Sequence, residues 1–145
     1  AGVPKGGLDS MRPLLSRFQD QILGVFRIVA GYAFMLHGAQ KIFGALGADG
    51  PVNYLSLRGL AGIIELFGGT MISVGLFTSY AAFIASGQMA VAYFVAHVAP
   101  NGGLLAPLTN RGEPAVLYCF IFLFLAATGG GAFSFDRLIS DRKKT

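Results

Sequence analysis

Four long apolar stretches, separated by polar or glycine- and proline-rich connectors, dominate the hydropathy pattern of the chain. They cover residues 21–43, 59–77, 79–99 and 114–132. Each has close to the ~20 residues that a helix needs to cross ~30 Å of hydrocarbon, and none alternates polar with apolar positions as a barrel strand does. The pattern predicts an all-α integral membrane protein with a bundle of four transmembrane helices.

Small residues recur at helix-face spacing in the first two stretches. Gly24, Gly31 and Gly38 are seven residues apart in the first, and Gly62 and Gly69 repeat that interval in the second. Helices in lipid approach closely where such residues share a face. We therefore expect these two helices to pack against each other along their glycines.

Composition decides which surroundings the chain fits. Hydrophobic residues make up 54% of the sequence and charged residues 12%, against about 25% charged in soluble proteins. This leaves too little polar sequence to cover a soluble surface around four apolar helices, so the lipid bilayer is the expected partner. Basic residues that flank membrane spans are expected from topology alone, so nucleic-acid binding is not indicated.

Charge also predicts the topology. Seven of the eleven Lys and Arg residues lie near the two ends, namely Lys5, Arg12, Arg17, Arg137, Arg142, Lys143 and Lys144. The positive-inside rule then puts both termini on the cytoplasmic side of a bacterial-type inner membrane. The chain divides into a cytoplasmic segment (1–20), the transmembrane domain (21–135) and a basic tail (136–145). Arg27, near the cytoplasmic end of the first helix, is expected to extend to the headgroups.

Glu65 is the residue that most needs an explanation. A carboxylate inside a spanning helix costs about 2.5–3.5 kcal/mol on insertion scales unless it has a partner. His37 lies at nearly the same depth on the antiparallel first helix, so the sequence predicts a hydrogen-bonded or ion-paired His37–Glu65 couple. Such a couple could pass a proton or bind a polar headgroup. The alternative, equally open, is a structural pair that only fixes helix register.

Further polar residues are expected near this couple. Gln40 and Lys41 follow His37 at i+3 and i+4 on one helix face. His97 and Glu113 are expected near the outer mouth of the bundle, on the same side of the membrane. Glu113 has a second interpretation, as an ordinary residue of a solvated loop.

Gln88, Cys119 and a metal ion are not expected in this site. Gln88 and His97 are nine residues apart on one helix, so an ideal α-helix places them on opposite faces, and His97, nearer the outer mouth of the bundle, is the one kept as a candidate. Cys119 is the only cysteine, which excludes an intrachain disulfide. Two histidines on different helices make an incomplete metal site, so no metal is predicted.

Five sequence blocks resemble a known family. They are LHGAQKIFG at residues 36–44, GIIEL at 62–66, GLFT at 75–78, NRGE at 110–113 and GGGAFSFD at 129–136. Their order, over residues 22–140, is similar to that of DoxX-like membrane proteins. Two positions depart from the family pattern: Ser79 stands where an arginine is usual, and Gly130 where a proline is common. The resemblance implies a small membrane subunit like those of thiosulfate:quinone oxidoreductases and redox-stress complexes.

The leading functional hypothesis is therefore a membrane subunit of a quinone- or sulfur-linked redox complex. Its pocket would be formed by His37, Gln40, Lys41, Glu65, His97 and Glu113, with His37 and Glu65 as the candidate catalytic residues. A bound quinone is the implied ligand. The chain shows no motif for an intrinsic cofactor, so electrons would come from other subunits and the chain would be at most one part of an oxidoreductase. The alternatives are a structural accessory subunit and a small-solute or proton transporter.

Overall fold

The computed structural model of the protein describes residues 13–143, and within that range all regular structure is helical. A short 3-10 turn leads into α1 (Gln19–Phe43), which runs antiparallel to α2 (Leu57–Val74). The loop between them ends at Ser56, whose hydroxyl accepts a hydrogen bond from Gly59 N and so caps α2. These two helices form the first pair. Lys5, Arg12 and Lys144 lie outside the described residues.

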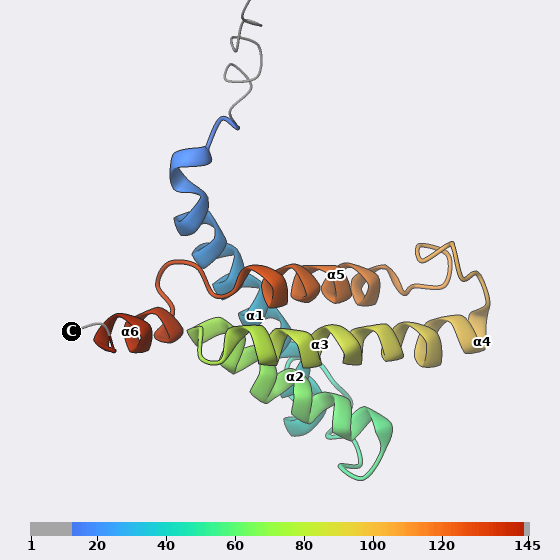
Figure 1. Ribbon diagram of the computed structural model, residues 1–145. Coiled ribbons are helices and arrows are strands. Elements are labelled where there is room, and N and C mark those ends of the chain that lie inside the picture. Colours follow the sequence, from blue (N-terminus) through green and yellow to red (C-terminus); the bar gives the residue numbers. More distant parts are fainter. Residues whose placement is uncertain (1–12, 144–145) are drawn as a thin grey trace, which may run out of the picture.

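The second pair is built from α3 (Thr78–Ala92) and α5 (Glu113–Thr128), which lie side by side (Figure 1). Beyond Ala92, α3 continues as a π-helical segment (Tyr93–Val98) and the short α4 (Ala99–Asn101). Pro100 accounts for this change, because proline lacks the N–H of an α-helical bond and its ring clashes with the carbonyl four residues earlier.

A last helix, α6 (Phe135–Arg142), follows the second pair. It begins one residue before the segment 136–145, which the sequence analysis treated as a basic tail, and Ser134 caps its first turn. The apolar fourth helix ends at Thr128 rather than at residue 132, because Gly129 adopts a φ of 80° that breaks the helix.

Length and hydropathy support membrane insertion. Three helical stretches are long and apolar enough to cross a bilayer, namely Ser16–Phe43, Leu57–Val74 and Thr78–Asn101. The helix Glu113–Thr128 is apolar but shorter, at 16 residues. The described part of the chain thus has the composition of a multi-pass membrane protein.

The glycine faces hold the first pair together, as the sequence pattern predicted. A Cβ built on Gly31 would come within 2.5 Å of Ser73 N, and one on Gly69 within 2.5 Å of Met35 N. Any larger residue would force the two backbones apart, so the glycines set the helix separation.

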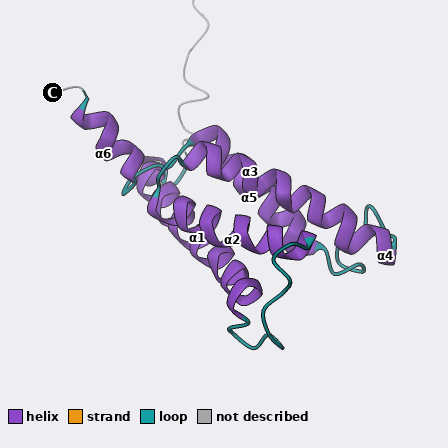
Figure 2. Ribbon diagram, turned by 90° about the horizontal axis from the view of Figure 1, so that it is seen from below, coloured by secondary structure: helices purple, strands orange, loops and turns teal. Residues whose placement is uncertain are grey.

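The two pairs meet at one end of the molecule and diverge toward the other. Figure 2 shows them close together near α6 and separated toward the two long loops, 44–56 and 102–112. At the end where the pairs meet, the closed end, the Asp20 carboxylate forms an ion pair with Arg137. The backbone carbonyl of Asp20 accepts a hydrogen bond from Ala132 N. The start of α1 and the start of α6 are therefore neighbours. The diverging geometry leaves room between the pairs for a cavity.

Candidate ligand-binding cavity

Glu65 lies on the face of α2 that meets α1 and is only 1% exposed. Gly62 and Gly69, one on each side of it along that face, bring α2 close to α1. Lys41 of α1 provides the compensating charge: its Nζ contacts both carboxylate oxygens, with Oε2 at 2.6 Å. The carboxylate is thus buried as one half of an ion pair whose other half is 26% exposed.

Gln88 of α3 approaches the same carboxylate from the second helix pair. Its Nε2 donates to Glu65 Oε1 at 3.3 Å. The amide must take this orientation, because the reverse one would place its oxygen against the carboxylate. Its Oε1 is left buried, with no hydrogen-bond partner among the described residues. A buried acceptor without a donor is costly, so this oxygen is a place for a ligand group that can donate.

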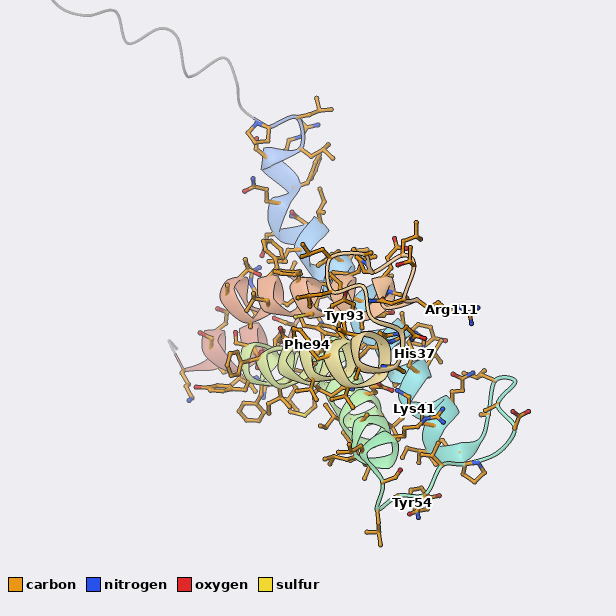
Figure 3. The ribbon with its side chains drawn as sticks, turned by 90° about the vertical axis from the view of Figure 1, so that its right-hand side faces the viewer. His37, Lys41, Tyr54, Tyr93, Phe94 and Arg111 are labelled. Atoms are coloured by element: carbon orange, nitrogen blue, oxygen red, sulfur yellow. The ribbon has the colours of Figure 1, made fainter. Side chains whose placement is uncertain are left out.

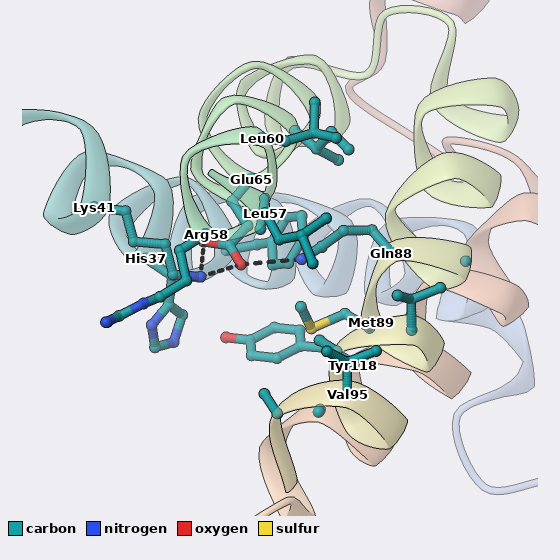
Figure 4. A pocket seen from close by; sticks show the side chains of 18 of the residues that line it. His37, Lys41, Leu57, Arg58, Leu60, Glu65, Gln88, Met89, Val95 and Tyr118 are labelled. Atoms are coloured by element: carbon teal, nitrogen blue, oxygen red, sulfur yellow. Dashed lines mark hydrogen bonds and ion pairs between the residues drawn. The ribbon is translucent and has the colours of Figure 1, made fainter. Parts of the chain in front are cut away.

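The partner of Glu65 differs from the sequence-based expectation. The prediction was a His37–Glu65 couple, whereas Lys41 makes the ion pair and the His37 ring lies edge-on to Tyr118, 5.9 Å between centroids. The reason is the direction of helical side chains, which lean toward the N-terminus. Lys41, one turn beyond His37, leans back far enough to bring its amine level with the carboxylate. Figure 4 shows the Lys41 amine between His37 and Glu65.

These polar groups lie in one cavity of about 680 Å³ between the two helix pairs. His37, Lys41, Arg58, Glu65, Gln88, His97 and Tyr118 supply its polar lining. The remaining walls are mostly apolar and include Phe34, Ile64, Phe83 and Met89. We call this space the Glu65 cavity. It is an apolar chamber with a polar cluster on one side, the usual character of a small-molecule site.

His97 and Gln88 line this same cavity, contrary to their expected placement on opposite faces. The π-helical segment Tyr93–Val98 is the cause, because its wider turns rotate His97 relative to an ideal α-helix. The His97 ring is held by Asn110, whose carbonyl lies 3.2 Å from Nδ1. Asn110 itself is buried, and its side-chain amide contacts the Tyr93 hydroxyl and the carbonyls of the loop that precedes α5.

Comparison with known proteins now identifies the family. A family model described as DoxX matches residues 22–98. A protein of Haemophilus influenzae, described as an uncharacterized protein, is 41% identical over 126 residues, which are 84% of this chain and 93% of the relative. The chain belongs to the DoxX family. No solved structure matches it.

The DoxX assignment and the long apolar helices together make this a multi-pass membrane protein whose helices contact lipid. The matched range includes every polar residue of the Glu65 cavity except Tyr118, which belongs to α5. The sequence analysis did not select Tyr118. In Figure 4 its hydroxyl points into the cavity toward His37.

Two predicted site residues of this DoxX protein lie away from the Glu65 cavity. Gln40 donates a hydrogen bond from Nε2 to the Leu46 carbonyl at 3.2 Å and so connects the loop after α1 to the end of that helix. Glu113 begins α5 and lines a smaller apolar hollow of about 390 Å³ between α1 and α5. Figure 3 shows His37 and Lys41 together on α1, with Arg111 apart on the loop before α5. The structure thus brings together four of the six predicted residues: His37, Lys41, Glu65 and His97.

Arg27 is not a headgroup contact, as the sequence position suggested, but a fully buried residue. Its Nη1 donates to the last carbonyls of α2, Ile72 and Ser73, the former at 2.8 Å. Its Nε and Nη2 donate to carbonyls of the turn after α5, including Gly130 at 2.8 Å and Phe133 at 3.0 Å. The guanidinium therefore joins α1, the negative end of the α2 dipole and the turn before α6.

In residues 13–143, no group of three or more His, Cys, Asp or Glu side chains is placed to hold a metal ion. The polar lining of the Glu65 cavity offers hydrogen-bond donors and acceptors and several titratable side chains. Its cations, Lys41 and Arg58, outnumber its carboxylate. A ligand head that accepts and donates hydrogen bonds suits this lining.

Proposed function

We propose that this DoxX protein is the membrane subunit of a quinone-linked redox complex and that its Glu65 cavity holds the quinone head. The observation that carries the proposal is a buried Glu65 carboxylate paired with the partly exposed Lys41, with an unsatisfied Gln88 oxygen beside it, all in an apolar chamber of about 680 Å³. That volume lies within the ~300–1,000 Å³ of small-molecule pockets. The family resemblance supports it, since quinone-linked subunits are among the proteins that the chain resembles.

The chemistry of the pair suits both redox forms of a quinone. A quinone carbonyl accepts a hydrogen bond, for which the Lys41 ammonium is the donor, and a quinol hydroxyl donates one, for which Gln88 Oε1 is the acceptor. Reduction adds two electrons and two protons. In this proposal the protons pass through Lys41 and Glu65, with His37 at the cavity mouth as their exchange point. The electrons come from a redox centre of a partner subunit.

The proposal includes four membrane crossings. α5 is about 24 Å long at 1.5 Å per residue, short of a ~30 Å hydrocarbon core. It nevertheless lies along α3, to which it is joined by the hydrogen bond from Ser86 Oγ to the Cys119 carbonyl at 2.8 Å. A helix packed beside a spanning helix crosses with it, and local thinning of the bilayer accommodates the missing length.

Orientation and domain limits follow from charge. We infer that residues 21–135 form the membrane domain and that the basic segments 1–20 and 136–145 face the cytoplasm of a bacterial inner membrane. The Glu65 cavity then opens in the outer half of the bilayer. A reporter enzyme fused after residue 145, active only in the periplasm, would be inactive under this topology and active under the opposite one.

The test of function is quinone content after native purification with partner subunits. We expect quinone to copurify with the wild-type complex and to be lost from Glu65→Gln, together with quinone reduction. Glu113→Gln is the matched control, because it makes the same substitution outside the cavity. It should keep both quinone and activity.

Three outcomes would overturn the proposal. One is a wild-type complex that neither carries quinone nor binds an added one. Another is a Glu65→Gln variant with normal quinone content and normal activity. If that variant fails to assemble with its partners but still binds quinone, a structural subunit is favoured. The third is solute or proton flux in vesicles that contain this chain alone, which would favour a transporter.

A further inference from the structure

The Glu65 cavity is open along one flank of the molecule, between α2 and α3. Leu60 of α2 is 53% exposed, and Phe83, Val91 and Val95 on α3 and its π-helical extension are 68%, 59% and 53% exposed. All four also line the cavity that contains the buried Glu65. In a membrane protein an exposed apolar side chain at mid-helix contacts acyl chains. The cavity is therefore continuous with the lipid on this flank.

The chemistry of the lining changes from the centre of the molecule to this flank. Glu65 and Gln88, which carry the buried polar atoms, lie at the inner side, where both helix pairs contribute. The rim between α2 and α3 is apolar. A molecule with a polar head and a hydrocarbon tail matches this order, because its head satisfies the buried groups while its tail stays in the rim.

We propose that the ligand enters sideways from the bilayer through the gap between α2 and α3, and that its tail remains in this gap while its head contacts Glu65 and Gln88. The inference rests on the proposed function and adds the route by which the ligand enters and the place of its hydrocarbon tail. A water-soluble head without a tail would lose the contacts of the rim and bind more weakly.

Gly87 gives a direct way to close the gap. It lies on α3 next to Gln88, lines the cavity, and has no atom within 4 Å of a Cβ built on it. The space around that Cβ is open, so a leucine there can fill part of the cavity rim, and leucine favours the helix over glycine. Gly68 of α2 is the matched control, since a Cβ there meets only Ile64 Cγ2 at 4.0 Å and the residue is not part of the cavity lining.

The experiment measures binding of two probes to the full chain with its copurifying partners in nanodiscs. The probes are a decyl-tailed benzoquinone and its tailless parent, and the variants are Gly87→Leu, Gly68→Leu and Glu65→Gln. We expect Gly87→Leu to weaken the tailed probe by about tenfold or more, equivalent to ~1.4 kcal/mol, and the tailless probe by less than about twofold. Gly68→Leu should change neither, and Glu65→Gln should weaken both.

The outcomes separate this inference from the proposed function. If Gly87→Leu leaves the tailed probe unchanged while Glu65→Gln weakens both probes, the lateral route is wrong and the quinone site stands. An equal loss of both probes in Gly87→Leu also overturns the route, because the tail then plays no special part. If the wild-type protein binds neither probe, the proposed function itself fails. Retention of the native chromatographic profile shows that each variant is folded.

Discussion

Within residues 13–143, two charged side chains are buried, Arg27 and Glu65, and their surroundings differ. Arg27 is 0% exposed and donates from Nε, Nη1 and Nη2 to five backbone carbonyls, all at the end where the helix pairs meet. Glu65 is 1% exposed but lies where the pairs diverge, against a cavity, and the side chain of its partner Lys41 is 26% exposed.

The difference indicates which charge is structural and which is available for a ligand. The Arg27 guanidinium meets fixed backbone oxygens from two segments, the end of α2 and the turn after α5, and does not line the cavity. The Glu65 cluster has a spare acceptor, Gln88 Oε1, and open volume beside it. A buried charge with complete partners stabilises a fold, whereas one with incomplete partners at a cavity is a candidate for function.

The free energy of unfolding should fall most when the Arg27 hydrogen bonds at the closed end are removed. Arg27→Ala should lower the free energy of unfolding by about 3–5 kcal/mol, because it removes the hydrogen bonds that join α2 to the turn after α5 and leaves buried carbonyls without donors. Arg27→Lys should recover only part of this, since an ammonium cannot reproduce the planar fork. Unfolding in mixed micelles measures both. Arg58→Ala, an exposed cation at the other end, is the control and should stay within about 0.5 kcal/mol.

At the open end, the ion pair should tolerate joint removal better than the loss of one partner. Lys41→Met leaves a buried carboxylate and should cost up to about 2.5–3.5 kcal/mol, less to the extent that water reaches the site. The double variant Lys41→Met, Glu65→Leu should regain most of that stability yet bind no quinone. A micelle unfolding series completes the double-mutant cycle. If the single variant is as stable as wild type, Lys41 and Glu65 are not coupled.

Much of the fold could be predicted from the sequence, because membrane helices are recognised by their length and hydropathy. The glycine intervals of α1 and α2 predicted their contact, and the cost of a carboxylate in lipid predicted that Glu65 has a partner. The identity of that partner could not be read from depth alone. His37 and Lys41 share a helix face, and the lean of the lysine side chain along α1, visible only in three dimensions, decides between them.

Two other features depend on contacts between distant segments. Arg27 occupies a position typical of a snorkelling residue, and only the return of residues 130–133 to the start of α1 reveals its buried role. The shared cavity of Gln88 and His97 depends on a departure from α-helical geometry. Pro100 was the available signal for it, since a proline disrupts the α-helical hydrogen bonds of the turn that precedes it.

A smaller effect is expected from the cap that completes the closed end. Asp136 of α6 accepts hydrogen bonds from Phe77 N at 2.7 Å and Thr78 N at 2.8 Å, and thus serves as the missing N-cap of α3. Asp136→Ala should cost about 0.5–2 kcal/mol. Asp136→Asn keeps an acceptor oxygen and should cost less. Thermal unfolding of the purified variants measures the difference. If alanine and asparagine behave identically to wild type, the cap contributes nothing to stability.

The smallest effect on stability should accompany a clear effect on binding. Gln88→Leu removes one weak hydrogen bond to Glu65, 3.3 Å long, but also an unsatisfied buried oxygen, so the unfolding free energy should change by less than about 1 kcal/mol in either direction. Quinol binding should nevertheless weaken, because its hydroxyl loses an acceptor. Ser86→Ala is the matched control: it removes an α3 side-chain hydrogen bond outside the cavity and should leave binding unchanged. Equal quinol affinity in Gln88→Leu and wild type would remove the functional meaning assigned to the incomplete partners of Glu65.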